Sequence, residues 1–105
     1  MRYSKYRATQ TVYKGIKFHS QGEFKRYLEL KLLEAANKIS ELKLQPKYPL
    51  VVDKSLVCNY IADFEYLEDG VLITEDFKGM ITPMFRLKRK LFEILYKRKL
   101  RLTFK

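Results

Sequence analysis

Residues 57–78 read VCNYIADFEYLEDGVLITEDFK, and this stretch decides the fold. Two runs rich in β-branched and aromatic residues flank Asp69-Gly70, a dipeptide typical of a two-residue hairpin turn. The pattern predicts one strand over 57–67 and a return strand over 71–78. Asp63 and Asp76 each lie six residues from such a turn, so the pairing predicts that they face each other across the hairpin.

The predicted hairpin places a lysine and a further acid on the face of the two aspartates. Lys78 follows Asp76 by two residues and Glu65 follows Asp63 by two, and side chains alternate between the faces of a strand. Like charges directly opposite each other destabilise a hairpin, so a bound cation, a nearby lysine or a shared proton should offset the repulsion. The opposite face is predicted to be largely core and carries Tyr60, Ala62, Phe64, Tyr66, Ile73, Glu75 and Phe77.

Two close carboxylates beside a lysine suit metal-assisted hydrolysis of a phosphate ester. Mg²⁺ prefers oxygen ligands, and it can activate a water and neutralise phosphate charge. A lysine can orient or deprotonate that water, or stabilise the charge that develops. The alternative interpretation is a solvated hairpin face with an ordinary Asp–Lys pair, because such triplets are common by chance and a one-residue change in the turn destroys the register.

A first helix is expected before this hairpin, over residues 21–38. Ser20 followed by Glu23 fits a capping box, and the apolar positions recur at helical spacing. These apolar positions are Phe24, Tyr27, Leu28, Leu32, Ala35 and Ile39. Glu23 either serves only as the capping glutamate or, from the rim of the apolar stripe, reaches the aspartate pair.

The remaining segments complete a mixed α/β pattern. Residues 11–13 and 16–18 read as a short hairpin around Lys14-Gly15, and Pro46 and Pro49 point to an edge strand over 42–52. Thr82-Pro83 begins a second helix that runs to about residue 98, and a short strand follows over 100–104. The expected order is hairpin, helix, three strands, helix and strand.

Length and charge point to a single basic domain with a polyanionic partner. The chain has 105 residues, which predicts a basic arm over 1–10 and one domain over 11–105. Residues 1–50 carry 11 basic and 4 acidic side chains (net +7), residues 51–82 carry 2 and 7 (net −5), and residues 83–105 carry 9 and 1 (net +8). Basic flanks favour nucleic acid, and an acidic centre suits a metal held beside the phosphates.

Several classes of protein are disfavoured by the composition. Cys58 is the only cysteine, which excludes an intramolecular disulfide and a multi-cysteine zinc site, and His19 is the only histidine. The chain has no apolar run long enough to span a membrane, no signal-peptide pattern and no glycine-rich phosphate loop. We therefore expect a cytoplasmic protein with a reduced thiol and no membrane partner.

The second helix is the expected contact surface for DNA. Arg86, Arg89, Lys90 and Lys97 share one side of the helical wheel, whereas Lys88 falls near the apolar side and either extends to solvent or points to the sheet. Gln45, just before Pro46, can contact the scissile phosphate or be an ordinary surface residue.

Glu23 on a helix, Asp63 on a strand and the triplet Asp76-Phe77-Lys78 on the next strand together resemble the PD-(D/E)XK nuclease superfamily. The resemblance covers roughly residues 11–98 and extends to a small phage family placed with these nucleases. It implies a restriction-endonuclease-like core, with a mixed central sheet flanked by two main helices. It also implies a divalent-metal-dependent DNA endonuclease that uses Mg²⁺, with Mn²⁺ as a substitute.

The resemblance also assigns roles. Asp63 and Asp76 would hold the metal, Glu23 would assist, and Lys78 would handle the nucleophilic water. Similarity to phage enzymes that resolve Holliday junctions suggests branched DNA, recombination, a host-cytoplasmic location and a homodimer that makes paired cuts. The triplet acid is Asp rather than the commoner Glu, which bears on metal number and geometry.

Two other classes of function stay open. A non-catalytic nucleic-acid-binding protein on the same scaffold would keep the basic flanks and use the acidic face structurally. A carboxylate acid/base enzyme such as a glycosidase needs a carboxylate pair, but it explains neither the basic flanks nor the nearby lysine.

Overall fold

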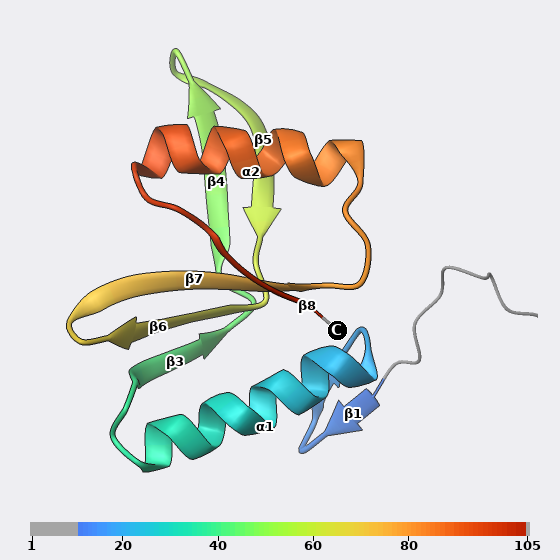
Figure 1. Ribbon diagram of the computed structural model, residues 1–105. Helices are drawn as coiled ribbons and strands as arrows, with labels where there is room; N and C mark the ends of the chain where they lie inside the picture. Colours follow the sequence, from blue (N-terminus) through green and yellow to red (C-terminus); the bar gives the residue numbers. More distant parts are fainter. Residues whose placement is uncertain (1–10, 105) are drawn as a thin grey trace, which may run out of the picture.

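The computed structural model describes residues 11–104, which fold around a four-stranded sheet (Figure 1). The sheet order is β3-β6-β7-β8, with β3 at Ser40–Leu44, β6 at Phe64–Glu68, β7 at Val71–Lys78 and β8 at Arg101–Phe104. β8 runs parallel to β7, whereas the other neighbours are antiparallel. The fold is therefore α/β with a mixed sheet and two helices, as the sequence predicts. The predicted arm over 1–10 lies outside the described residues.

One side of the sheet is covered by the N-terminal part of the chain. β1 (Thr11–Tyr13) and β2 (Ile16–Phe18) form the predicted hairpin, and α1 (Gln21–Ala35) follows. The buried core on this side consists of Phe18, Tyr27, Leu30, Ile39, Phe64 and Tyr66.

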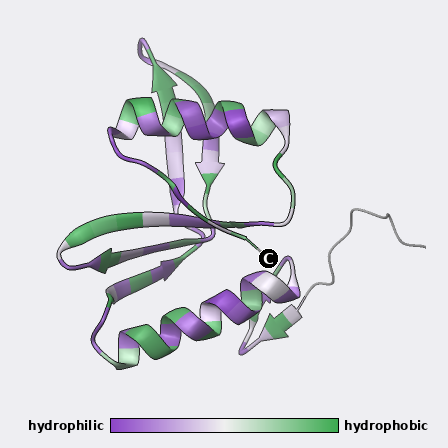
Figure 2. Ribbon diagram, in the orientation of Figure 1, coloured by the Kyte–Doolittle hydropathy of each residue, from purple (hydrophilic) through white to green (hydrophobic). Residues whose placement is uncertain are grey.

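The other side carries a separate two-stranded sheet and the second helix. β4 (Lys47–Val52) pairs with β5 (Ser55–Ile61), and α2 (Pro83–Tyr96) packs against them. The buried core here consists of Tyr48, Leu50, Tyr60, Ala62, Phe85, Phe92 and Leu100. Figure 2 shows hydrophilic and hydrophobic segments alternating along both helices, as expected for helices with one face on a core. Within 11–104 no helix is long and apolar enough to cross a membrane.

The predicted β6–β7 hairpin is confirmed, with the predicted register. Phe64 pairs with Glu75 and Glu68 pairs with Val71. Asp69 and Gly70 have φ values of 53° and 77°, the left-handed conformations that a tight hairpin turn requires.

The single strand predicted over 57–67 is wrong, and so is the single edge strand over 42–52. Each divides into two strands that belong to different sheets. The Ala62 N–H donates to the Pro46 carbonyl, and the Gln45 N–H donates to the Asp63 carbonyl, so the two connections run side by side. Gln45 has a φ of 53°, which redirects the chain from β3 into β4.

Both faces of the four-stranded sheet are covered by other elements, so the face that carries Asp76 is shielded from solvent at its centre. Thr74 and Asp76 are buried there.

The helix caps are confirmed, but the buried face of α1 differs from the prediction. Ser20 Oγ accepts from the Glu23 N–H, and Thr82 Oγ1 accepts from the Phe85 N–H. The helix ends at Ala35, earlier than predicted. Leu28 and Leu32 of the predicted apolar stripe are exposed, as is Ala35, whereas Glu23 and Leu30 are buried beside Tyr27. The helix is rotated because Glu23 and Arg26 face the sheet, where each has polar partners.

Candidate active site at the break between two sheets

Asp63, Asp76 and Lys78 come together where β5 passes into β6. The Asp63 N–H donates to Asp76 Oδ1 (3.1 Å), and Asp63 Oδ2 accepts from the Phe77 N–H (2.8 Å). Lys78 Nζ lies 3.6 Å from Asp76 Oδ2. Asp63 and Asp76 are adjacent, as predicted, although Asp63 lies one residue before the first paired position of β6.

Glu23 joins this group from the first turn of α1. Glu23 is 4% exposed, and its Oε1 accepts from the His19 N–H (3.0 Å). Burial raises the pKa of the Glu23 carboxyl and the charge of Asp76 adds to the rise, while the His19 contact opposes it. The capping contact of Glu23 is thus present through the His19 N–H, and the charge of Asp76 acts on the same carboxyl, while a role of Glu23 at the aspartate pair stays a prediction.

Within residues 11–104, the site gathers three carboxyl groups around Lys78. Burial raises the pKa of Asp63, and the neighbouring charges of Asp76 and Glu23 raise it further. A site made of carboxylate oxygens suits a hard cation such as Mg²⁺, and Asp63, Asp76 and Glu23 are the side chains that could hold it. Within residues 11–104, however, no group of three His, Cys, Asp or Glu side chains has the arrangement of a ready-made metal site.

Tyr60 belongs to the site although the sequence assigned it to the opposite face. Its hydroxyl donates to Asp76 Oδ2. Burial, followed by the charge of Asp76, raises the pKa of Tyr60, so the phenol stays a proton donor. The hairpin pairing predicted from the sequence extends from Phe64 back to Tyr60, whereas the pairing with β7 begins at Phe64 and Tyr60 lies in β5, which pairs with β4. We find no signal in the sequence that reveals this break.

Two contacts between α1 and β7 that the sequence did not predict hold α1 against the site. A Cβ added to Gly22 would lie closer than 3.0 Å to two carbons of the Phe77 ring, so a glycine is needed beside Glu23. Glu75 is fully buried and accepts from Arg26 Nε (2.6 Å) and Nη2 (3.0 Å). β7 thus directs Asp76 and Lys78 toward one side of the sheet and Glu75 and Phe77 toward α1.

Gln45 borders the site through its backbone. Its N–H donates to the Asp63 carbonyl (2.9 Å), and its exposed side chain lies 3.5 Å from the Lys17 carbonyl (Nε2 to O). Gln45 is therefore close to the aspartates in space, as a phosphate-contacting residue would need to be.

The basic helix α2 begins at the site and leads away from it. Lys78 Nζ lies 4.1 Å from the centre of the Phe85 ring in the first turn of α2. Arg86, Lys90 and Lys97 are exposed, Lys88 is half-buried toward the core side, and Arg89 Nε contacts Glu93 Oε2 (3.2 Å).

Comparisons with known proteins place the chain in a family but assign it no activity. No curated protein and no solved structure matches it. One family model matches residues 3–105, nearly the whole chain. The chain therefore belongs to the family described as protein of unknown function (DUF1064).

Proposed function

We propose that this protein is a divalent-metal-dependent nuclease with a restriction-endonuclease-like core, and that it hydrolyses phosphodiester bonds in DNA. The observation that carries the proposal is the meeting of Asp63, Asp76 and Glu23 with Lys78 at the break between two sheets. The raised pKa of Asp63 supports it, because a cation would relieve the repulsion that causes the rise.

A bound Mg²⁺ would neutralise charge on a substrate phosphate and increase the acidity of a water molecule. Asp63 and Asp76 would hold the ion, with Glu23 beside them. Tyr60 and the Asp63 N–H orient the Asp76 carboxylate through its two oxygens.

Lys78 is the cation of this site that the chain itself supplies. Its ammonium lies over the Phe85 ring, 4.1 Å from the ring centre, and this contact helps to hold it in place. From there it can orient or deprotonate an attacking water, or stabilise the charge that develops on the phosphate. Branched DNA and paired cuts by a homodimer remain part of the proposal through the resemblance alone.

The second candidate is a nucleic-acid-binding protein without catalysis. The hydrogen bonds of the two aspartates favour it, because Asp63 Oδ2 accepts from a backbone N–H and Asp76 Oδ1 accepts from another. These carboxylates could serve only to close the break between β5 and β6.

A cleavage panel separates the two candidates. The protein is incubated with supercoiled plasmid, linear duplex, single strand, a flap and a four-way junction, in Mg²⁺, Mn²⁺ or EDTA. We expect metal-dependent cutting that Lys78→Ala abolishes without a loss of DNA binding.

Lys43→Ala is the matched control for this panel. Lys43 Nζ lies 3.8 Å from Glu65 Oε2 on the same sheet, so it is also a lysine beside a hairpin carboxylate. We expect this variant to cut normally. Binding without cutting in every metal, or full activity of Lys78→Ala, would contradict the nuclease assignment.

A further inference from the structure

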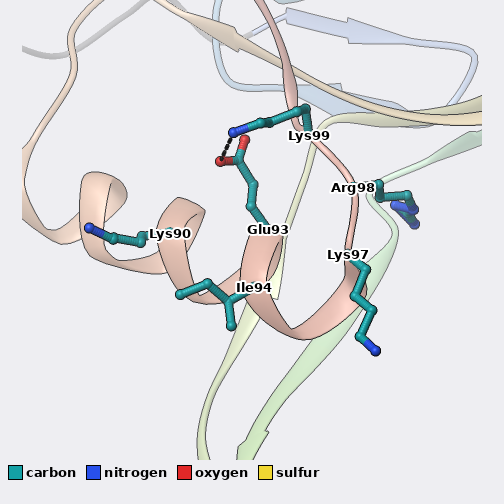
Figure 3. A pocket seen from close by; sticks show the side chains of 6 residues that line it. All are labelled: Lys90, Glu93, Ile94, Lys97, Arg98 and Lys99. Carbon is teal, nitrogen blue, oxygen red and sulfur yellow. Dashed lines mark ion pairs between the residues drawn. The ribbon is translucent and has the colours of Figure 1, made fainter.

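A shallow basic hollow of about 360 Å³ lies at the C-terminal end of α2 (Figure 3), and none of the candidate-site residues Asp63, Asp76 and Glu23 lines it. It is lined by Lys90, Glu93, Ile94, Lys97, Arg98 and Lys99. Residues 89–99 contain five cationic side chains and one anionic side chain. Such an excess of positive charge at a surface suits a polyanion.

The one acid of the hollow is already bound by the protein. Glu93 Oε2 accepts from the Leu100 N–H (2.9 Å) and from Arg89 Nε (3.2 Å). Although its partial burial acts in the opposite direction, these two contacts lower the pKa of Glu93. Glu93 therefore organises the turn after α2. Its Oε1 also lies 3.8 Å from Lys99 Nζ, the ion pair drawn in Figure 3, so it offsets part of the charge of Lys99.

Arg98 lines the hollow, but its guanidinium is held by contacts within the protein. Its Nη1 donates to Thr74 Oγ1 (3.0 Å), and its guanidinium lies over the rings of Tyr48, Phe92 and Tyr96. This leaves Lys90 and Lys97 as the exposed cations that a ligand would meet, with Lys99 beside Glu93, and Figure 3 shows the three lysine side chains extending from different sides of the hollow.

Lys97 occupies a position where glycine is the usual residue. It follows the last residue of α2 and has a φ of 57°, in the left-handed region that terminates helices. A lysine is strained in this conformation, as are Lys54 and other non-glycine residues of the chain at positive φ. The C-terminal end of a helix also carries a partial negative charge of about half an elementary charge, which the charges of Lys90 and Lys97 exceed.

We propose that this hollow binds a backbone phosphate of double-stranded DNA, about five base pairs from the bond that is cut. The inference rests on the proposed function and names its substrate as a duplex arm. Lys78 contacts Phe85 in the first turn of α2, and Lys97 follows Phe85 by twelve residues. At 1.5 Å per residue the separation is about 18 Å, and at 3.4 Å per base pair this corresponds to about five base pairs.

The test compares Lys97→Gly with Lys54→Gly. Both lysines are exposed and lie at positive φ, at 57° and 65°, so each substitution removes one charge and relieves the same backbone strain. Lys54 lies in the β4–β5 turn and does not line the hollow. We expect both variants to raise the midpoint of thermal unfolding by a few degrees.

Only Lys97→Gly should weaken DNA binding. Binding to a 20-base-pair duplex is measured by fluorescence anisotropy in EDTA at several salt concentrations. Loss of one phosphate contact lowers the magnitude of the slope of log affinity against log salt by about 0.9. The ratio of wild-type to variant affinity should therefore fall about 3.5-fold between 50 and 200 mM salt. Lys90→Gln is a second variant and should lower the slope in the same direction.

Cleavage then tests the spacing. The cut is mapped on a long duplex, and substrates are made with either three or eight base pairs beyond it on each side. Lys97→Gly should cut the longer substrate more slowly than wild type, and the difference should vanish on the shorter one. If wild type cuts no DNA, the proposed function fails, while the salt slope still tests the hollow. If Lys97→Gly keeps the wild-type slope, the phosphate site is overturned whether or not the protein cuts.

Discussion

Breaking the ion pair between Arg26 and Glu75 from the arginine side should be among the most destabilising single changes in this domain. Glu75 is fully buried and is held by both Nε and Nη2 of Arg26, by the Tyr66 hydroxyl (2.5 Å) and by the Thr103 hydroxyl (3.2 Å). Arg26→Met keeps most of the packing of the aliphatic stem but leaves a buried carboxylate with two hydroxyl partners. Removal of one partner of a buried pair costs about 3–5 kcal/mol.

This loss is large beside the total stability of about 5–15 kcal/mol that is usual for such a domain. At an m value of about 1.5–2 kcal/mol per molar, it lowers the urea midpoint by about 2–3 M. The unfolding can be followed by circular dichroism, or by tyrosine fluorescence because the chain has eight tyrosines and no tryptophan.

Two controls identify the cause. Arg26→Met with Glu75→Gln removes both charges and keeps an acceptor for Tyr66, so it should recover most of the loss. Arg89→Met breaks a more exposed pair with Glu93 and should cost about 0.5 kcal/mol or less.

A loss below about 1 kcal/mol for Arg26→Met, or no recovery in the double variant, would contradict the conclusion that Glu75 is a buried anion held by Arg26.

Three other outcomes are expected at the site. Gly22→Ala should destabilise the fold by about 1–3 kcal/mol through the clash with Phe77, and the better helix propensity of alanine should offset up to about 1 kcal/mol of this loss. Adding Phe77→Leu should recover the loss, as measured by thermal unfolding. In EDTA, the midpoint of thermal unfolding should fall as the pH rises above about 4, because the raised pKa values of Asp63 and Glu23 mean that the folded form holds these protons more tightly than the unfolded form. Mg²⁺ should restore the stability, and a midpoint that does not change with pH in EDTA would contradict this prediction. Tyr60→Phe should cost about 1–3 kcal/mol in urea unfolding and weaken Mg²⁺ binding about 10–100-fold in titration calorimetry, whereas unchanged binding would separate Tyr60 from the metal site.

Local patterns in the sequence were enough to predict the hairpin, both helix starts and the closeness of Asp63 to Asp76. Asp69-Gly70 can adopt the left-handed conformations of a two-residue turn, and that turn sets the register of every pair after it. Ser20 and Thr82 are caps whose hydroxyls accept from the first turn of the helix that follows. These features depend on residues close together in the chain, so their signals are strong in a single sequence.

The sequence did not predict the two positions where a continuous run of strand-forming residues divides between two sheets. Residues 57–67 alternate like one strand, yet the chain leaves one sheet at Ile61 and enters another at Phe64, because Ala62 and Gln45 bond across to distant segments. This break alone brings Tyr60 to Asp76.

Tertiary structure likewise decided which face of α1 is buried. The spacing of its leucines favoured Leu28 and Leu32, but buried partners for Glu23 and Arg26 on the sheet outweighed that preference. The sequence by itself therefore determined the turns, the caps and the two aspartates. Only the packing of distant segments decided which polar side chains surround those aspartates, because the cost of burying a charge depends on partners that lie far away along the chain.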